Sequence, residues 1–192
     1  MAQLGFYFDM TSCAGCKTCQ IACNDRNDLK VGTLFRQVKT FEIGSFPTPG
    51  AYHFSSTCNH CENPKCVAGC PTGAMHKLED GTVGHNKERC IGCRYCTWNC
   101  PYSVPQYIEE IGKVGKCDFC KDLIDQGENP VCVDACVMRA IKWGDLDELK
   151  AKYGSVSTSD LPILPLSSIT NPSTLIKAKT IAKQKDFQSK EV

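Results

Sequence analysis

Residues 90–101 read C-I-G-C-R-Y-C-T-W-N-C-P. Four cysteines in this stretch follow the spacing C-x2-C-x2-C-x3-C, and a proline closes it. Three thiolates on one tight loop can bind three irons of one cubane, whereas the fourth points away and ligates a second cluster. The spacing is therefore typical of a bacterial-type [4Fe–4S] ferredoxin, and it predicts a partner group of cysteines elsewhere in the sequence.

Twelve further cysteines supply that partner and more, because the 192-residue chain holds 16 in all. The first group repeats the spacing of residues 90–100 but is followed by Asn24. The second has a four-residue middle gap and ends in Pro71; the fourth has an eleven-residue middle gap and is followed by Val137. In sequence order the groups are Cys13, Cys16, Cys19 and Cys23; Cys58, Cys61, Cys66 and Cys70; Cys90, Cys93, Cys96 and Cys100; Cys117, Cys120, Cys132 and Cys136.

The pairing of groups follows from the rule that the fourth cysteine crosses over. The second and third groups lie close together and both end in Cys-Pro, so they resemble an intact two-cluster ferredoxin, which the other two groups flank. We therefore expect four [4Fe–4S] clusters. Their expected ligands are Cys13, Cys16, Cys19 and Cys136 (cluster 1); Cys117, Cys120, Cys132 and Cys23 (cluster 2); Cys58, Cys61, Cys66 and Cys100 (cluster 3); Cys90, Cys93, Cys96 and Cys70 (cluster 4).

The predicted fold is α+β, with one two-cluster ferredoxin unit nested inside another. The four-cluster domain spans residues 1–154, with the inner unit at about 55–110 and a β-hairpin insertion at about 24–57. Asp145 is a predicted helix N-cap, with Glu148 three residues on and Gly154 as the stop. Strands or hairpins are predicted at 6–8, 35–43 with 51–54, 75–84, 106–114 and 140–143.

The tail, residues 155–192, contains no cysteine and cannot bury a core of its own. It could be a disordered end. Apolar anchors at 161–166 and 175–176 favour an extended arm that docks on another subunit.

Composition excludes several classes of protein. Apolar residues make up 42 % of the chain, but all 16 cysteines are among them and aromatic residues reach only 8 %, so cross-links must supplement a thin core. The net charge of +1 favours neither nucleic acid nor a membrane surface as a partner. No apolar run is long enough to span a membrane, and residues 1–5 show no basic or twin-arginine leader. The compartment could be cytoplasmic, membrane-associated, or reached with a partner that carries the signal.

Other metal and redox sites fit the cysteines less well. A structural zinc site uses two separated Cys pairs rather than three cysteines on one loop, and repeated spacing is needless in a disulfide scaffold. The sequence contains neither a C-x-x-C-H haem motif nor a lone thioredoxin pair. The four histidines match no ligand spacing and are expected to be solvated or to lie behind the ligands. Tyr95 and Trp98 are expected to shield a cluster from water.

Several stretches also resemble a known family: residues 14–19, 58–61, 71–77 and 105–107, together with the spacing of the four groups. They are similar to the iron–sulfur subunits of the dimethyl sulfoxide reductase family of molybdopterin oxidoreductases, over about residues 3–153. Val137 departs from this pattern, since a proline commonly follows the fourth group. The family reduces or oxidises several kinds of substrate, so the resemblance names none.

The resemblance implies partners and a direction for the electron path. Such subunits pair with a large catalytic subunit that carries molybdenum or tungsten on a bis-pterin cofactor, and often with a membrane anchor that exchanges electrons with quinol. Cluster 1 would face the pterin subunit, and cluster 4 would lie towards the quinone side or another donor. In the nitrate reductase branch a Trp replaces one cysteine of the third group; here that position is Cys96, which implies four cubanes.

Two functions follow from the sequence. The first is a non-catalytic electron-transfer subunit with four clusters in an oxidoreductase complex of anaerobic respiration. The alternative is a free-standing soluble polyferredoxin that carries electrons between diffusing partners. A docking arm would be superfluous in a diffusing carrier, so the tail is expected to distinguish them. A zinc-bound scaffold is a remote third interpretation.

Overall fold

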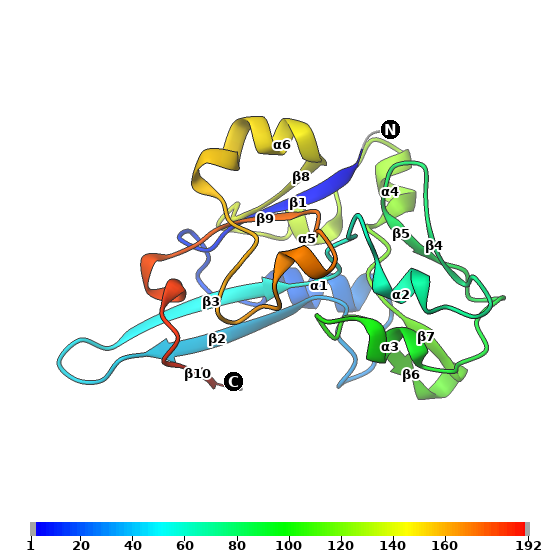
Figure 1. Cartoon of the computed structure of the whole chain (residues 1–192), viewed down its shortest axis with the longest axis horizontal. Helices are drawn as coiled ribbons and strands as arrows, with labels where there is room; N and C mark the ends of the chain where they lie inside the picture. The colour runs from blue at the N-terminus through cyan, green and yellow to red at the C-terminus, as the bar shows by residue number, and fades with distance from the viewer. Residues whose placement is uncertain (1–2, 191–192) are drawn as a thin grey trace.

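A three-stranded sheet joins the two ends of the cysteine-rich region in the computed structural model, which describes residues 3–190. The central strand β1 (Leu4–Asp9) precedes the first cysteine group, and β8 (Ile141–Asp145) follows the fourth and pairs antiparallel with it. Strand β9 (Thr174–Lys177) pairs parallel with the other edge of β1. Figure 1 shows β8, β1 and β9 together in the upper part of the molecule.

A long hairpin forms the second sheet and carries the predicted insertion. Strands β2 (Gln37–Ile43) and β3 (Gly50–Ser56) pair along their whole lengths, and β10 (Phe187–Lys190) adds to the outer edge of β2. Phe41 stacks on Tyr52 at 5.2 Å between ring centroids. The hairpin extends to the left in Figure 1, and its inner part packs against the sheet of β1.

Two short hairpins surround the second and third cysteine groups. Strand β4 (Met75–Lys77) pairs with β5 (Val83–His85), and β6 (Gln106–Ile108) pairs with β7 (Lys113–Gly115). A 3₁₀ turn, η1 (Glu109–Ile111), connects β6 to β7. These elements lie with α2 and α3 on the right of Figure 1. The fold thus mixes α and β elements as predicted, and each predicted hairpin is present.

Five short helices of four to nine residues lie in or directly after the cysteine loops. Helix α1 packs against α5, and α2 packs against α3. Because α1 belongs to the first group and α5 to the fourth, these contacts join groups that are far apart in the sequence. The helices are α1 (Thr18–Arg26), α2 (Lys65–Ala68), α3 (Tyr95–Asn99), α4 (Lys121–Asp125) and α5 (Val131–Asp134).

Helix α6 (Leu146–Tyr153) confirms the predicted cap. The Asp145 carboxylate accepts hydrogen bonds from the backbone N–H groups of Asp147 and Glu148, which have no partner within the first turn. Leu146 and Leu149 face β1, where they pack with the buried Tyr7.

The tail lies on its own subunit rather than extending away from it. Besides β9 and β10 it contains the 3₁₀ turns η2 (Gly154–Val156), η3 (Ser167–Ile169) and η4 (Thr180–Lys183). Its apolar anchors Leu161 and Ile176 are 5 % and 2 % exposed within the main core. We expected these side chains to dock on another subunit. The physical reason for the difference is that β1 leaves one edge free, which β9 covers.

Candidate iron–sulfur cluster sites

All sixteen cysteines lie among the described residues, and each is a free thiol. Two thiols, Cys16 and Cys93, are exposed; four are half-buried and the other ten are buried. The two exposed thiols occupy the same position in the first and third groups. The half-buried thiols are Cys13, Cys70, Cys90 and Cys100.

The first and third groups share a backbone conformation that turns the chain tightly. Gly15 and Gly92 both have a φ angle of 69°, and Lys17 and Arg94 have φ angles of 61° and 60°. A side chain at position 92 would place its Cβ 2.3 Å from the carbonyl oxygen of Gly112. Only glycine fits there, for conformational and steric reasons. The two loops are therefore structural repeats, and each leads directly into a helix, α1 or α3.

The second and fourth groups form another repeat, despite their different lengths. Pro64 and Pro130 stand immediately before α2 and α5, in extended conformation, and the second residue of each helix is a buried cysteine, Cys66 or Cys132. Proline is preorganised for a helix start and lacks an N–H that would need a partner. The eleven-residue gap of the fourth group holds helix α4.

His60 and Phe119 occupy equivalent positions in that repeat, each one residue before a cysteine. Both have positive φ angles, 42° and 66°, and both are fully buried. Their rings meet edge to face with centroids 5.0 Å apart. The contact joins the loop of the second group to the loop of the fourth near the centre of the molecule.

Thiols of the second and third groups approach one another in the part of the fold that contains α2 and α3. Burial and the neighbouring thiols of Cys70, Cys90 and Cys93 together raise the pKa of Cys96 to about 11. The same four cysteines line one small cavity, together with apolar side chains that include Val114. Their donor set and common cavity fit a [4Fe–4S] cluster.

A second set of thiols joins the same two groups. Burial raises the pKa of Cys61 to about 11 and that of Cys66 to about 12. Both thiols interact electrostatically with Cys58 and with Cys100, the fourth cysteine of the third group. The fourth cysteine of each group thus lies near the first three of the other.

The first and fourth groups show the same exchange. Burial raises the pKa of Cys13, and Cys19, Cys136 and Cys16 act on it as neighbouring thiols. Burial also raises the pKa of Cys23 to about 12, with Cys132 and Cys120 among the groups that interact with it. Cys117 interacts with Cys23 and with Cys58. The outer pair of groups therefore adjoins the inner pair.

Backbone N–H groups point at several of the sulfurs. Met75 donates to Cys70 Sγ at 3.4 Å, and Ala140 donates to Cys136 Sγ at 3.2 Å. Both acceptors are the fourth cysteine of their group. Such bonds favour a thiolate over a thiol, and they influence the reduction potential of a cluster bound to it. Burial raises the pKa of other thiols, such as those of Cys23, Cys61 and Cys66, so iron binding would have to displace their protons.

Within residues 3–190, no set of three or more His, Cys, Asp or Glu side chains converges on a point that suits a single metal ion. The thiol sets described above are more widely spaced. A cubane differs from a mononuclear site because each thiolate binds its own iron atom.

The tail closes over the loop of the second cysteine group. Glu62 donates its N–H to the carbonyl of Asn171 at 2.8 Å, and Ser173 donates to the carbonyl of Asn59 at 2.9 Å. Thr170 is 1 % exposed and its hydroxyl lies 3.2 Å from that of Tyr102, in the loop after the third group. Residues 170–173 thus hold together the loops that carry Cys61 and Cys100.

Three side chains near the cysteine groups differ in exposure. Tyr95 and Trp98 are 50 % and 76 % exposed, so that much of each ring faces solvent. His60 is fully buried next to Cys61 and its Nδ1 accepts a hydrogen bond from the Val83 N–H, so of the two expected positions it takes the one behind the cysteines. Sequence reasoning missed Arg36, a buried cation, because a lone arginine between Phe35 and Gln37 gives no sign of burial.

Comparison with known proteins identifies the family. Residues 50–146, half of the chain, match the 4Fe-4S dicluster domain. The B subunit of the anaerobic dimethyl sulfoxide reductase of Haemophilus influenzae is 43 % identical, over 95 % of this sequence and 93 % of its own length. This protein belongs to the family of dimethyl sulfoxide reductase B subunits. The B subunit of the Escherichia coli anaerobic dimethyl sulfoxide reductase is also 43 % identical, over 91 % of this sequence and 88 % of its own length. The B subunit of Wolinella succinogenes polysulfide reductase is 36 % identical, over 90 % of this sequence and 92 % of its own length.

Membership of this family of B subunits confirms the resemblance expected from the cysteine spacing and the matching stretches. It assigns the protein to iron–sulfur proteins of electron transport that are subunits of oxidoreductase complexes. None of the helices formed by residues 3–190 has the length and hydropathy needed to cross a bilayer.

Proposed function

We propose that this protein relays single electrons through four [4Fe–4S] clusters. One end of the relay contacts a large catalytic subunit that carries molybdenum or tungsten on a pterin cofactor. The other end contacts a quinol-linked membrane anchor or another donor. The protein itself is non-catalytic. Its relatives are named as components of reductases, which supports a place in a complex of this kind.

The proposed ligands follow the crossover rule. The repeated backbone of the groups and the four sets of interacting thiols support this assignment. The contacts α1–α5 and α2–α3 support two nested ferredoxin units. Cluster 1 takes Cys13, Cys16, Cys19 and Cys136; cluster 2 takes Cys117, Cys120, Cys132 and Cys23; cluster 3 takes Cys58, Cys61, Cys66 and Cys100; cluster 4 takes Cys90, Cys93, Cys96 and Cys70.

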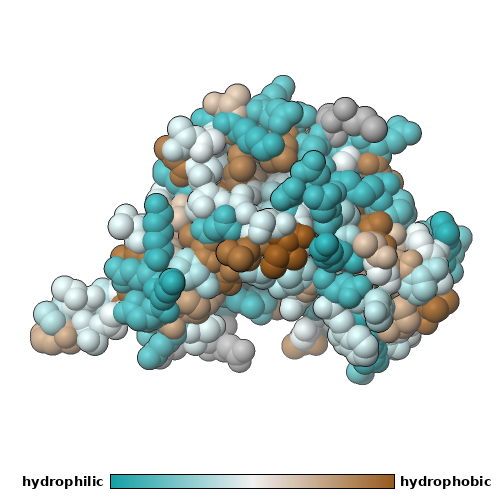
Figure 2. Space-filling view, viewed as in Figure 1, coloured by the Kyte–Doolittle hydropathy of each residue, from teal (hydrophilic) through white to brown (hydrophobic). Residues whose placement is uncertain are grey.

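The observation that carries the proposal is the pair of exposed thiols at two separate surfaces. Cys93 lies in the loop before α3, beside the exposed side chains Ile91, Tyr95 and Trp98. In Figure 2 apolar side chains reach the surface on the right, where Figure 1 places α3 and the inner hairpins. An exposed apolar surface of this kind is typical of a protein interface.

The second surface belongs to the first and fourth groups. Cys16 is exposed in the loop before α1, and Ile21 on α1 is 61 % exposed. Val137 and Met138, which follow the fourth group, are 66 % and 48 % exposed. Electron transfer in and out of a relay needs one accessible cluster at each end, and clusters 1 and 4 meet this condition.

The protein's own residues hold and insulate the relay. When bound, [4Fe–4S] clusters supply one-electron redox chemistry. The ten buried thiols exclude water from the ligand shell, and backbone N–H groups such as those of Met75 and Ala140 stabilise the sulfur charge. Clusters 2 and 3 adjoin each other through Cys117 and Cys58, which gives the relay a continuous path.

Metal analysis of the complex tests the proposal. The tagged protein would be purified without oxygen, together with whatever binds it. We expect about 16 irons per molecule, from four irons in each of four clusters, and stoichiometric molybdenum or tungsten in a large partner. Full iron with neither metal nor partner would replace this proposal with the free polyferredoxin, and zinc in place of iron would refute both.

A further inference from the structure

Two cations are buried next to the cysteine groups, Arg36 and Lys116, and the Lys116 ammonium is satisfied by the carbonyls of Val83 and Cys117. Arg36, just before β2, is 2 % exposed. No ion pair with a carboxylate is found for it among residues 3–190, and its Nη2 is buried without a hydrogen-bond partner. A buried charge without a counter-charge is strongly destabilising. The position therefore calls for a negative group nearby.

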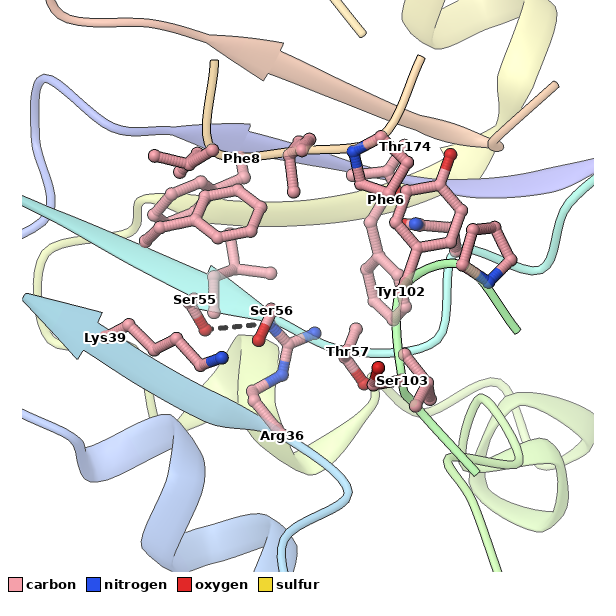
Figure 3. A pocket seen from close by; sticks show the side chains of 18 of the residues that line it. Phe6, Phe8, Arg36, Lys39, Ser55, Ser56, Thr57, Tyr102, Ser103 and Thr174 are labelled. Carbon is pink, nitrogen blue, oxygen red and sulfur yellow. Dashed lines mark hydrogen bonds between the residues drawn. The ribbon is translucent and has the colours of Figure 1, made fainter. Parts of the chain in front are cut away.

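The cavity beside Arg36 does not supply that group. It has a volume of about 180 Å³ and lies between the β2–β3 hairpin, β1 and the loop after the third cysteine group (Figure 3). Its lining is apolar, hydroxylic or, at Asn59, an amide, with Arg36 and Lys39 as its charged side chains and no Asp or Glu among the described residues. The Phe6 ring lies 5.2 Å from the guanidinium carbon, and this cation–π contact attracts the cation but carries no counter-charge.

Ser55 connects Arg36 to a cysteine. Arg36 Nη1 donates to Ser55 Oγ at 2.9 Å, the dashed line in Figure 3, and Ser55 Oγ lies 3.5 Å from Cys19 Sγ. A guanidinium can only donate, so Ser55 Oγ accepts that bond and keeps its own proton for the sulfur. All three residues are buried, with exposures between 2 % and 7 %. The sulfur of Cys19 therefore receives a hydrogen bond that is polarised by a positive charge.

Arg36 also adjoins the ligands proposed for cluster 2. The preceding residue, Phe35, packs in one apolar cluster with Cys23 and Cys117. The side chains that interact electrostatically with the Arg36 guanidinium are the thiols of Cys132, Cys19, Cys117 and Cys23. Three of these four belong to cluster 2.

Given the four clusters of the proposed function, we infer that Arg36 is a positioning and tuning residue that raises the reduction potentials of clusters 1 and 2. It acts on cluster 1 through Ser55 and on cluster 2 directly through space. A thiolate-bound cluster is an anion that gains a further negative charge when it accepts an electron. A fixed buried cation stabilises the reduced form more than the oxidised form, so it favours reduction without any proton transfer.

The test is a potentiometric EPR titration of the anaerobically purified full-length protein, with its iron content measured first. Arg36→Gln removes the charge, and we expect the reduction equilibrium constants of clusters 1 and 2 to fall about tenfold, which is about 59 mV for a one-electron couple. Arg36→Lys retains the charge and should restore most of the shift in cluster 2. Ser55→Ala should lower the reduction potential of cluster 1 alone. Lys150→Gln, which removes an exposed cation on α6, is the control and should leave all four reduction potentials unchanged.

Each outcome decides the matter. Four unchanged reduction potentials in an iron-loaded Arg36→Gln variant would overturn the inference. Equal shifts in the Gln and Lys variants would also overturn it, because an effect of the charge must be smaller where Lys retains that charge. If Arg36→Gln fails to take up iron, Ser55→Ala decides, and an unshifted cluster 1 overturns the link to Cys19. The proposed function is tested separately, because a wild-type protein with fewer than four clusters contradicts that proposal whatever the variants do.

Discussion

Phe119 should be the most sensitive apolar position near the clusters, and Phe119→Ala tests how far packing supports them. The side chain is fully buried between Cys117 and Cys120. It stacks on Phe6 with centroids 4.3 Å apart, meets His60 edge-on at 5.0 Å, and meets the Trp143 ring at 6.2 Å. It therefore joins strand β1 to the loops of the second and fourth groups.

The magnitude follows from these contacts. Truncation of a buried Phe to Ala costs about 3–5 kcal/mol, and each aromatic pair contributes about 0.5–1.5 kcal/mol of that loss. The positive φ angle of 66° is unfavourable for Ala and Phe alike, so it does not change the difference. Unfolding that releases a metal cluster is irreversible, so the measurable quantity is a rate. If half of a loss of about 3 kcal/mol lowers the activation free energy of unfolding, iron release accelerates about tenfold. If the whole loss lowers it, iron release accelerates more than about a hundredfold.

The assay is anaerobic release of iron to a chelator in moderate denaturant, followed by the loss of cluster absorbance. Trp98→Ala is the matched control, because Trp98 is also an aromatic residue inside a cysteine group but is 76 % exposed. Exposed substitutions usually change stability by no more than about 0.5 kcal/mol, so its rate should change less than about threefold. Equal rates for the two variants would refute the argument that Phe119 packing supports the clusters.

Three further predictions concern the ligands, the tail and the metal. Cys100→Ser should damage cluster 3, whose other ligands are in the second group, and spare cluster 4. Mössbauer and EPR spectra that show damage to cluster 4 instead would refute the assignment of each fourth cysteine to the cluster of the other group. Deletion of residues 170–192 removes the contacts with the loop of the second group and should selectively speed iron loss from cluster 3; unchanged release would mean that the tail is dispensable there. Complete removal of iron should abolish most far-UV circular dichroism, since aromatic residues are only 8 % of the sequence; a native-like apo spectrum would contradict a cluster-dependent fold.

Local sequence patterns predicted most of the regular structure. The hairpins of β2–β3, β4–β5 and β6–β7 all stand where apolar segments flank glycine, proline or polar turns. Helix α6 was recognisable because Asp145 and Gly154 mark its ends. The short helices α2, α3 and α5 were not predicted individually. At four or five residues they are too short to show a helical period, and proline or loop geometry sets where they begin.

The tail shows where such patterns fail. Strand β9 has four residues, and nothing in its composition reveals that β1 offers a free parallel edge. Two isolated apolar anchors were equally compatible with docking on another subunit. The distinction between subunit and free carrier that we drew from the tail is lost, because its described part covers its own subunit.

The sequence by itself determined the chemistry of this protein: sixteen thiols in four groups, with spacings that suit a cubane because a short loop can reach only certain irons. It also determined the family, through stretches that lie within those loops. Only the tertiary structure brought Arg36 and Ser55 against Cys19, packed Phe119 between the loops of the second and fourth groups, and laid the tail over the loop of the second group. These contacts join residues that are tens of positions apart in the sequence, and no local pattern encodes them, because they depend on how whole elements pack.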